Sequence, residues 1–203
     1  EVEGYSLNKI QGELAADLIM EGQESGMKIN TLRLLLDEDM SLDVIGQVGW
    51  TEGIAWQAEL SGNNLNPGLF LPEWPGKVQT EIRSQGKKNG EELLAEFQLE
   101  KLSGTLRDLP LTGSGKAAIN GKKIQVDALH LQSGSTRIDV DGQADEQNLH
   151  FTLQARSDDL TPFIPELRGS FVIQAEAQGT AEHPEIQLSL TGFEPAFRNY
   201  ALH

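Results

Sequence analysis

Few residues in this chain have the types and spacing that catalysis or metal binding requires. Asp139 and Asp141 lie two positions apart, and paired carboxylates can serve acid–base catalysis or bind Ca²⁺. A similar segment earlier in the chain has Asp43 and Ile45 at these positions. Solvent-facing charges are therefore the favoured interpretation of this pair.

Two other patterns are weaker still. The segment GSGKAA (113–118) lacks the G-x-x-x-x-G-K-[ST] spacing of a phosphate loop and lies in a strand-like pattern, which favours small residues for close packing. The four histidines show no metal-ligand spacing: His130, His150, His183 and His203. No spacing points to a Ser-His-Asp triad, although sequence alone leaves one open. We predict no enzyme, no cofactor and no metal ion.

The elements that must position these side chains are β-strands, because apolar and polar residues alternate along most of the chain. Trp56 and Leu60, for example, share one side of a strand and Gln57 takes the other. One apolar and one polar face suit an antiparallel sheet with one wet side. The dipeptides Asn89-Gly90 and Asn120-Gly121 predict type I′ hairpin turns. We predict an all-β protein of about a dozen strands, with almost no helix.

Composition limits the class of protein further. The chain has 203 residues, of which 38% are hydrophobic, and a formal net charge of −15, which argues against binding to nucleic acid or to an anionic membrane surface. It has no cysteine, so disulfides and cysteine-ligated metal are excluded. No apolar run approaches the roughly 18 residues that span a bilayer. The chain begins EVEGYSL and ends NYALH, so we expect both ends to be cut from a longer protein.

An internal repeat organises the sequence, with a spacing of about 95 residues. Three segments match in the same order: LDVIGQVGW (42–50) with IDVDGQADE (138–146), IAWQAELSGNNLNP (54–67) with LHFTLQARSDDLTP (149–162), and PEWPGKVQTEIRSQG (72–86) with PELRGSFVIQAEAQG (165–179). We therefore predict a first repeat at 1–96 and a second at 97–203 that ends where a third would begin. Together they form one continuous β structure.

A proline-rich segment recurs once per repeat. NNLNPGLFLPEWPG (63–76) corresponds to DDLTPFIPELRG (158–169) between equivalent strands. Proline favours corners and the first turn of short helices. We expect the segment to be a short cap whose apolar residues fold back over the sheet: Leu69, Phe70, Leu71 and Trp74.

The ordered set of motifs resembles the TamB family, within the AsmA-like group of Gram-negative bacteria. The resemblance covers nearly the whole chain and rests on GQVGW, WQAELSG, NLNPGLFLPEWPG, LSGTLRDLPLTGSG (102–115) and LHLQSGSTRIDVDGQ (129–143). The second copy departs at PELRG, which lacks the Trp-Pro of PEWPG. The resemblance implies a long, curved antiparallel sheet folded like a taco around an apolar groove. It also implies a periplasmic location, an inner-membrane anchor outside this segment, and a TamA-like outer-membrane barrel as partner through other parts of the protein.

The residues support a groove independently, because a sheet with one apolar face must cover it. A groove made of a dozen strands about 4.8 Å apart would be roughly 55–60 Å long. Removing an acyl chain of about 16 methylenes from water would be worth about 13 kcal/mol. A dry β-sandwich core is the alternative. We expect the groove to be lined by Leu14, Leu18, Leu34, Val44, Val48, Trp50, Trp56, Leu60, Phe70, Trp74, Val78, Ile82, Leu93, Phe97, Leu99, Ile119, Val126, Leu131, Ile138, Val140, Phe151, Leu153, Phe171, Ile173 and Leu188.

Three functions follow from these interpretations. The leading one is a segment of an inner-to-outer-membrane bridge whose groove carries phospholipid acyl chains. The second is a scaffold or chaperone in the assembly of outer-membrane β-barrel proteins. The third, a carbohydrate-active or adhesive domain, would place aromatic residues on the polar face, whereas the three tryptophans fall in the apolar register or in the proline-rich segment.

Overall fold

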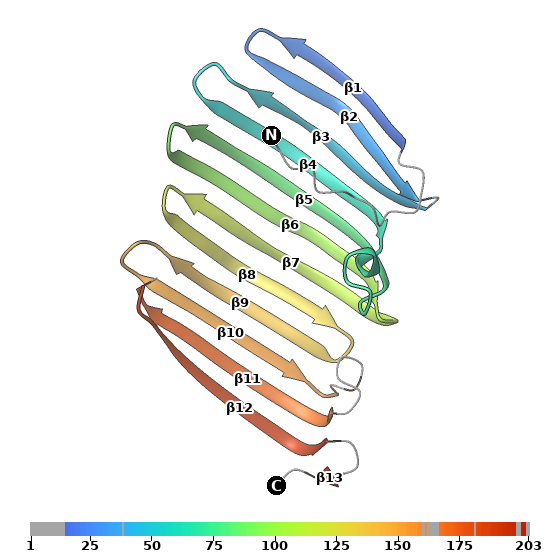
Figure 1. Ribbon diagram of the computed structural model, residues 1–203, viewed down its shortest axis with the longest axis vertical. Helices are drawn as coiled ribbons and strands as arrows, with labels where there is room; N and C mark the ends of the chain where they lie inside the picture. Colours follow the sequence, from blue (N-terminus) through green and yellow to red (C-terminus); the bar gives the residue numbers. More distant parts are fainter. Residues whose placement is uncertain are drawn as a thin grey trace, which may run out of the picture.

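The described part of the chain is one antiparallel sheet. The computed structural model describes residues 15–37, 39–159, 161, 167–180, 182–197 and 200–201. Thirteen strands of this part pair in chain order, each with its sequence neighbours (Figure 1). They are β1 (Ala15–Gln23), β2 (Gly26–Asp37), β3 (Met40–Gly49), β4 (Ile54–Leu65), β5 (Gly76–Asn89), β6 (Glu92–Leu106), β7 (Leu109–Asn120), β8 (Lys123–Ser133), β9 (Thr136–Ala144), β10 (Leu149–Ser157), β11 (Leu167–Gly179), β12 (Pro184–Phe197) and β13 (Tyr200–Ala201).

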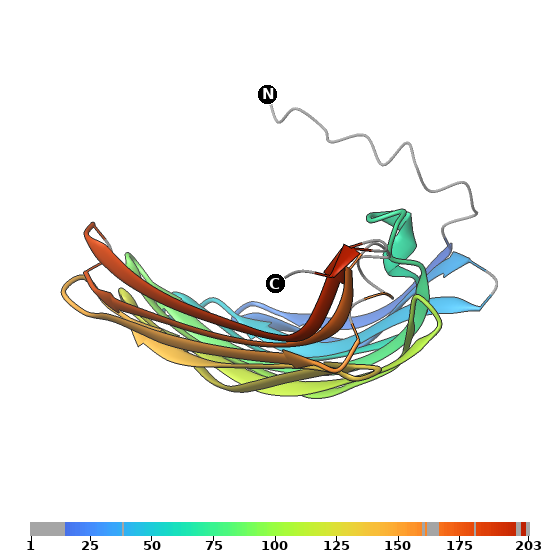
Figure 2. The same ribbon diagram turned by 90° about the horizontal axis from the view of Figure 1, so that it is seen from below.

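The sheet is open and curved along its strands. Seen along the direction in which strands stack, it forms a trough with one concave and one convex face (Figure 2). The one helical element of the described residues, the 3₁₀ turn η1 (Pro67–Leu69), stands at one rim on the concave side. The prediction of an elongated, curved, antiparallel all-β sheet with a short proline-rich cap is confirmed.

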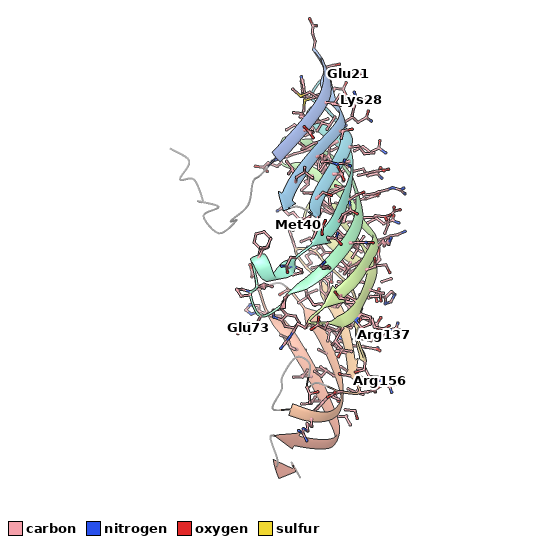
Figure 3. All side chains as sticks on the ribbon, turned by 90° about the vertical axis from the view of Figure 1, so that its right-hand side faces the viewer. Glu21, Lys28, Met40, Glu73, Arg137 and Arg156 are labelled. Carbon is pink, nitrogen blue, oxygen red and sulfur yellow. The ribbon has the colours of Figure 1, made fainter. Side chains whose placement is uncertain are left out.

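Strand register sorts the side chains by face. Trp56 of β4 pairs with Val48 of β3 and with Gly86 of β5, and this row continues through Ala95 and Ile119. On the other side of the same strands, most cross-strand partners are polar, with Ile45 opposite Glu59 as an exception. Figure 3 shows Lys28, Arg137 and Arg156 projecting from the convex side. The apolar face is therefore the concave one.

Glycines on the concave face make room for aromatic rings. A Cβ added at Gly86 would lie 2.3 Å from Cζ2 of Trp56, and one added at Gly142 would lie 2.5 Å from Cδ1 of Phe151. Each ring thus lies across the glycine of a neighbouring strand. Inward curvature leaves less room per residue on the concave side, and pairing large with small side chains fills that room without voids.

The hairpins correct part of the turn prediction. Asn89 and Asn120 are the last residues of their strands, and the following glycine takes the first central position, with φ of 56° at Gly90 and 59° at Gly121. The Asn-Gly pairs are therefore not the central residues of type I′ turns. The pattern of positive φ at both central positions occurs instead at Arg107 and Asp108, with φ of 51° and 63° between the paired ends of β6 and β7.

A β-bulge interrupts β8 where it pairs with β9. Ala128 has φ of +48°, a left-handed conformation that is strained for alanine, and the register shifts between Val126 and Leu129. The backbone N–H of Ala128 donates to Oδ1 of Asp141 at 2.7 Å. Asp141 therefore satisfies the backbone group that the bulge removes from the strand ladder.

Candidate functional site: the concave apolar face

The floor of the concave face is a set of cross-strand rows that runs from β1 to β12. One row follows Leu18, Leu32, Val44, Leu60 and Ile82, and it continues through Leu99, Gly115, Leu129, Val140, Leu153, Ala175 and Leu188. The exposed fraction reaches 68% at Leu188 in β12 and 50% at Leu18 in β1. The outer strands of the described part thus leave large apolar side chains uncovered.

Twenty-one of the twenty-five residues predicted to line a groove take register positions on this one face. They are Leu18, Leu34, Val44, Val48, Trp56, Leu60, Val78, Ile82, Leu93, Phe97, Leu99, Ile119, Val126, Leu131, Ile138, Val140, Phe151, Leu153, Phe171, Ile173 and Leu188. Trp50 lies in the β3–β4 connection, while Phe70 and Trp74 lie between β4 and β5. Leu14 is outside the described residues. Contact of these side chains with lipid stays a prediction.

Small hydroxyls on the floor are mostly hydrogen-bonded within it. The indole Nε1 of Trp56 donates to Oγ of Ser84 at 3.0 Å, and Oγ1 of Thr136 lies 2.8 Å from Oγ of Ser157. Ser133 carries a buried hydroxyl oxygen without a hydrogen-bond partner among the described residues. An apolar ligand on this face would therefore meet few unpaired polar atoms.

The proline-rich segment forms the cap at one rim. Oδ1 of Asn66 accepts from the backbone N–H of Gly68 at 2.9 Å and of Gly76 at 3.2 Å, which closes the segment into a loop. The guanidinium carbon of Arg107 lies 5.4 Å from the centroid of the Trp74 ring, a cation–π geometry.

The apolar residues of this cap differ in how far they pack. Leu69 and Trp74 are half-buried, in agreement with the expectation that they fold back. Phe70 and Leu71 are 75% and 59% exposed, so these two side chains do not pack down on the sheet. Of the second copy of the cap, residues 160 and 162–166 lie outside the described part.

The convex face is covered with charged and amide side chains. Arg83 pairs with Glu59 at 3.1 Å and with Glu100 at 2.6 Å, and all three side chains remain partly exposed. A hollow of about 930 Å³ lies on this face, between long polar side chains such as Gln57 and Gln85. This hollow is separate from the apolar floor, which is a wide, open surface.

Asp139, Asp141, His130 and His150 lie on the convex face, and His183 lies in a turn. His203 is outside the described residues. Asp139 accepts hydrogen bonds from Arg137 at 2.8 and 3.0 Å and contacts Nδ1 of His130, and these bonds, that of Arg137 first, lower the pKa of its carboxyl group. Ser114, His130 and Asp139 are cross-strand neighbours and have the residue types of a Ser-His-Asp triad. The carboxyl group of Asp139 is, however, also bound by the guanidinium of Arg137. The arrangement is that of a surface ion-pair network.

The remaining motifs have structural explanations. Within GSGKAA, a Cβ at Gly113 would lie 2.8 Å from Leu131, and one at Gly115 would lie 2.9 Å from Leu129. Leucine side chains therefore occupy the space beside these glycines that a bound phosphate would need. The described residues contain no group of three or more His, Asp or Glu side chains able to hold a metal ion. The described residues also form no helix that is long and apolar enough to cross a bilayer.

Sequence reasoning missed one residue of the site, Lys88. It pairs with Ile54 and Leu93 at the hairpin end of the concave face. The alternation of Val78, Ile82 and Gly86 would have placed it there, but a charged residue was not expected on an apolar face.

Comparison with known proteins supports one family. The model of the TamB N-terminal domain matches residues 4–203. A translocation and assembly module subunit TamB from Haemophilus influenzae is 22% identical over 154 residues, which are 75% of this chain and 12% of that protein. The chain thus spans about an eighth of the length of this curated relative. No solved structure matches.

Proposed function

Starting from the fact that the chain belongs to the TamB family, through its N-terminal domain, we propose that its concave face carries the acyl chains of phospholipids. The segment would form part of a periplasmic bridge, in a protein anchored in the inner membrane elsewhere, that supplies the outer membrane. A TamA-like barrel would bind other parts of the protein. The role is one of transport, without catalysis.

One observation carries this proposal: apolar cross-strand rows continue along the whole described sheet on a single concave face. Removing about 16 methylenes from water completely is worth roughly 13 kcal/mol, and an open face that covers one side of the tail supplies part of this free energy. The rows repeat with little polar variation, so a tail can slide between strands with small changes in free energy. The phosphate headgroup stays at the rim, because burying its charge is costly.

Photo-crosslinking in the full-length protein tests this use of the face. A photo-crosslinking amino acid replaces Phe97 in one variant and Leu94 in the other. Both side chains belong to β6 and are similarly exposed, 40% and 39%, but they take opposite faces. We expect phospholipid adducts at position 97 and few at position 94. Absence of lipid adducts at both positions would refute the proposal. Equal adduct yields at the two positions would refute the assignment of lipid to the concave face.

A role in assembling outer-membrane β-barrel proteins is the second candidate, because exposed apolar side chains of the concave face, such as Leu188 and Phe97, could also hold an unfolded barrel strand. Crosslinks from position 97 to nascent barrel proteins, in place of phospholipid, would support this function over transport.

We further propose the division into repeats at 1–96 and 97–203. The elements of the two halves correspond: β3, β4 and β5 match β9, β10 and β11 at about the same spacing as the sequence segments. The aromatic residue of the middle strand lies across a glycine in both sets, but Gly86 belongs to the strand after Trp56 and Gly142 to the strand before Phe151.

A further inference from the structure

Lys88 is a cation on the concave, apolar side of the sheet. It lies opposite Ile54 of β4 and Leu93 of β6 in the strand register. It also follows Gly86 by two positions in β5, and the space beside Gly86 is filled by the indole of Trp56. Side chains two apart on a strand share a face. Lys88 therefore extends from the concave face at its hairpin rim.

The charge at this position is unusual for the chain. Among the register positions on the concave side of β3 to β10, as far as the structure describes them, Lys88 is the one charged residue. The chain has 31 acidic and 16 basic residues, yet the acidic ones of these strands fall on the convex side or in the turns. Lys88 thus places a positive charge beside the apolar floor of a protein that is negative as a whole.

Apolar side chains flank the lysine on both neighbouring strands. Ile54 of β4 is 50% exposed and Leu93 of β6 is half-buried. Lysine places its aliphatic stem along apolar surface and its ammonium group in water.

We propose that Lys88 binds the phosphate of a phospholipid and selects lipids whose headgroups carry net negative charge. This inference rests on the proposed transport function. The acyl chains would lie over Trp56 and Ala95 in the row next to Lys88, and the ammonium group would form a charge-assisted hydrogen bond with a phosphate oxygen. A zwitterionic headgroup offers the same phosphate, but its amine is repelled by the lysine.

Lys87 provides a matched control. It neighbours Lys88 in the same strand and carries the same charge, but it faces the convex side, where it lines the polar hollow with Gln57 and Gln85. Replacing either lysine with glutamate changes the net charge equally. Only Lys88→Glu alters the rim of the apolar floor.

The experiment uses the full-length protein with a photo-crosslinking amino acid at Ile54, which lies opposite Lys88. After irradiation in cells, mass spectrometry of peptide–lipid adducts gives the ratio of phosphatidylglycerol to phosphatidylethanolamine. We expect this ratio to exceed that of the surrounding membranes, to fall about two- to fivefold in Lys88→Glu, and to stay unchanged in Lys87→Glu. Hydrogen exchange of residues 76–89 verifies that both variants fold.

The outcomes distinguish a failure of this proposal from a failure of the proposed transport function. Equal ratios in the two variants, or a ratio in the unsubstituted protein equal to that of the membranes, would overturn the role of Lys88. Lipid adducts at position 97 with none at position 54 would also overturn it, while leaving transport intact. Absence of lipid at both positions would refute the transport function and this inference together.

Discussion

Substitution of Gly86 by alanine should loosen the middle of the sheet. The new Cβ would lie 2.3 Å from Cζ2 of Trp56, 2.4 Å from its Cη2 and 2.7 Å from the carbonyl oxygen of Leu94. The backbones of β5 and β6 are joined by ladder hydrogen bonds and cannot separate freely. The indole must therefore tilt away, which stretches its 3.0 Å hydrogen bond to Ser84.

Two terms set the size of this effect. Overpacking a well-filled site costs about 1–3 kcal/mol, and losing a neutral hydrogen bond costs about 0.5–1.5 kcal/mol. The sum, about 1.5–4.5 kcal/mol, corresponds to an increase of roughly tenfold or more in the local opening equilibrium. The effect should be confined to β4, β5 and β6, because each strand contacts only its neighbours.

Hydrogen exchange of the full-length protein measures the effect strand by strand. Gly22→Ala is the control, since an added Cβ at Gly22 meets nothing within 4 Å and its φ is outside the left-handed region. We expect faster exchange in peptides covering 54–65, 76–89 and 92–106 for Gly86→Ala and no change for Gly22→Ala. Equal protection in the two variants would refute the argument that the Trp56 indole occupies the space beside Gly86.

Three further predictions follow from the site. Asp141→Ala should speed hydrogen exchange in β8 and β9 by leaving the N–H of Ala128 unpaired, whereas Ala128→Gly should slow it, because glycine adopts φ of +48° without strain. The pKa of Asp139 is lowered in the folded protein, so its ionised form stabilises the fold at pH above about 4. Strand β9 should therefore lose protection from exchange as the pH falls through the lowered pKa of the folded state. Asp139→Asn should remove this pH dependence. Leu153→Arg should abolish lipid adducts on the concave face, whereas Gln154→Arg, on the convex side of the same strand, should leave them unchanged.

The strand arrangement was predictable because two local signals agree. Alternation with a period of two defines the faces, and short polar connections force neighbouring strands to be antiparallel. Turn chemistry was harder to predict. The Asn-Gly pairs drew attention to the wrong central residues, and the true positive-φ pair, Arg107 and Asp108, has no glycine. Its stabilisation comes partly from the cap, through the contact of Arg107 with Trp74, which sequence spacing does not reveal.

The face that a predicted lining residue takes was predictable where the residue belongs to a strand and less so elsewhere. In strands, parity assigns a face to every side chain, so most predicted lining residues share one side. Trp50, Phe70 and Trp74 lie in connections, where parity carries no information. Phe70 illustrates the difference, because its apolar character suggested burial and its side chain is 75% exposed. Bulges such as that at Ala128 shift parity and are visible only in the register.

Curvature, floor chemistry and function have a common origin in the distribution of side-chain size. Long glutamine, glutamate, lysine and arginine side chains need the diverging space of a convex face, while glycine, alanine and serine allow the concave face to bend inward without clashes. The small residues that permit bending also let rings such as Trp56 and Phe151 lie flat. A floor made this way is smooth and nearly free of unpaired polar atoms. Under the proposed function, an acyl chain would have similar free energy at many positions on it. Any preference for one lipid over another would then come from the rim, where Lys88 places a charge next to the floor.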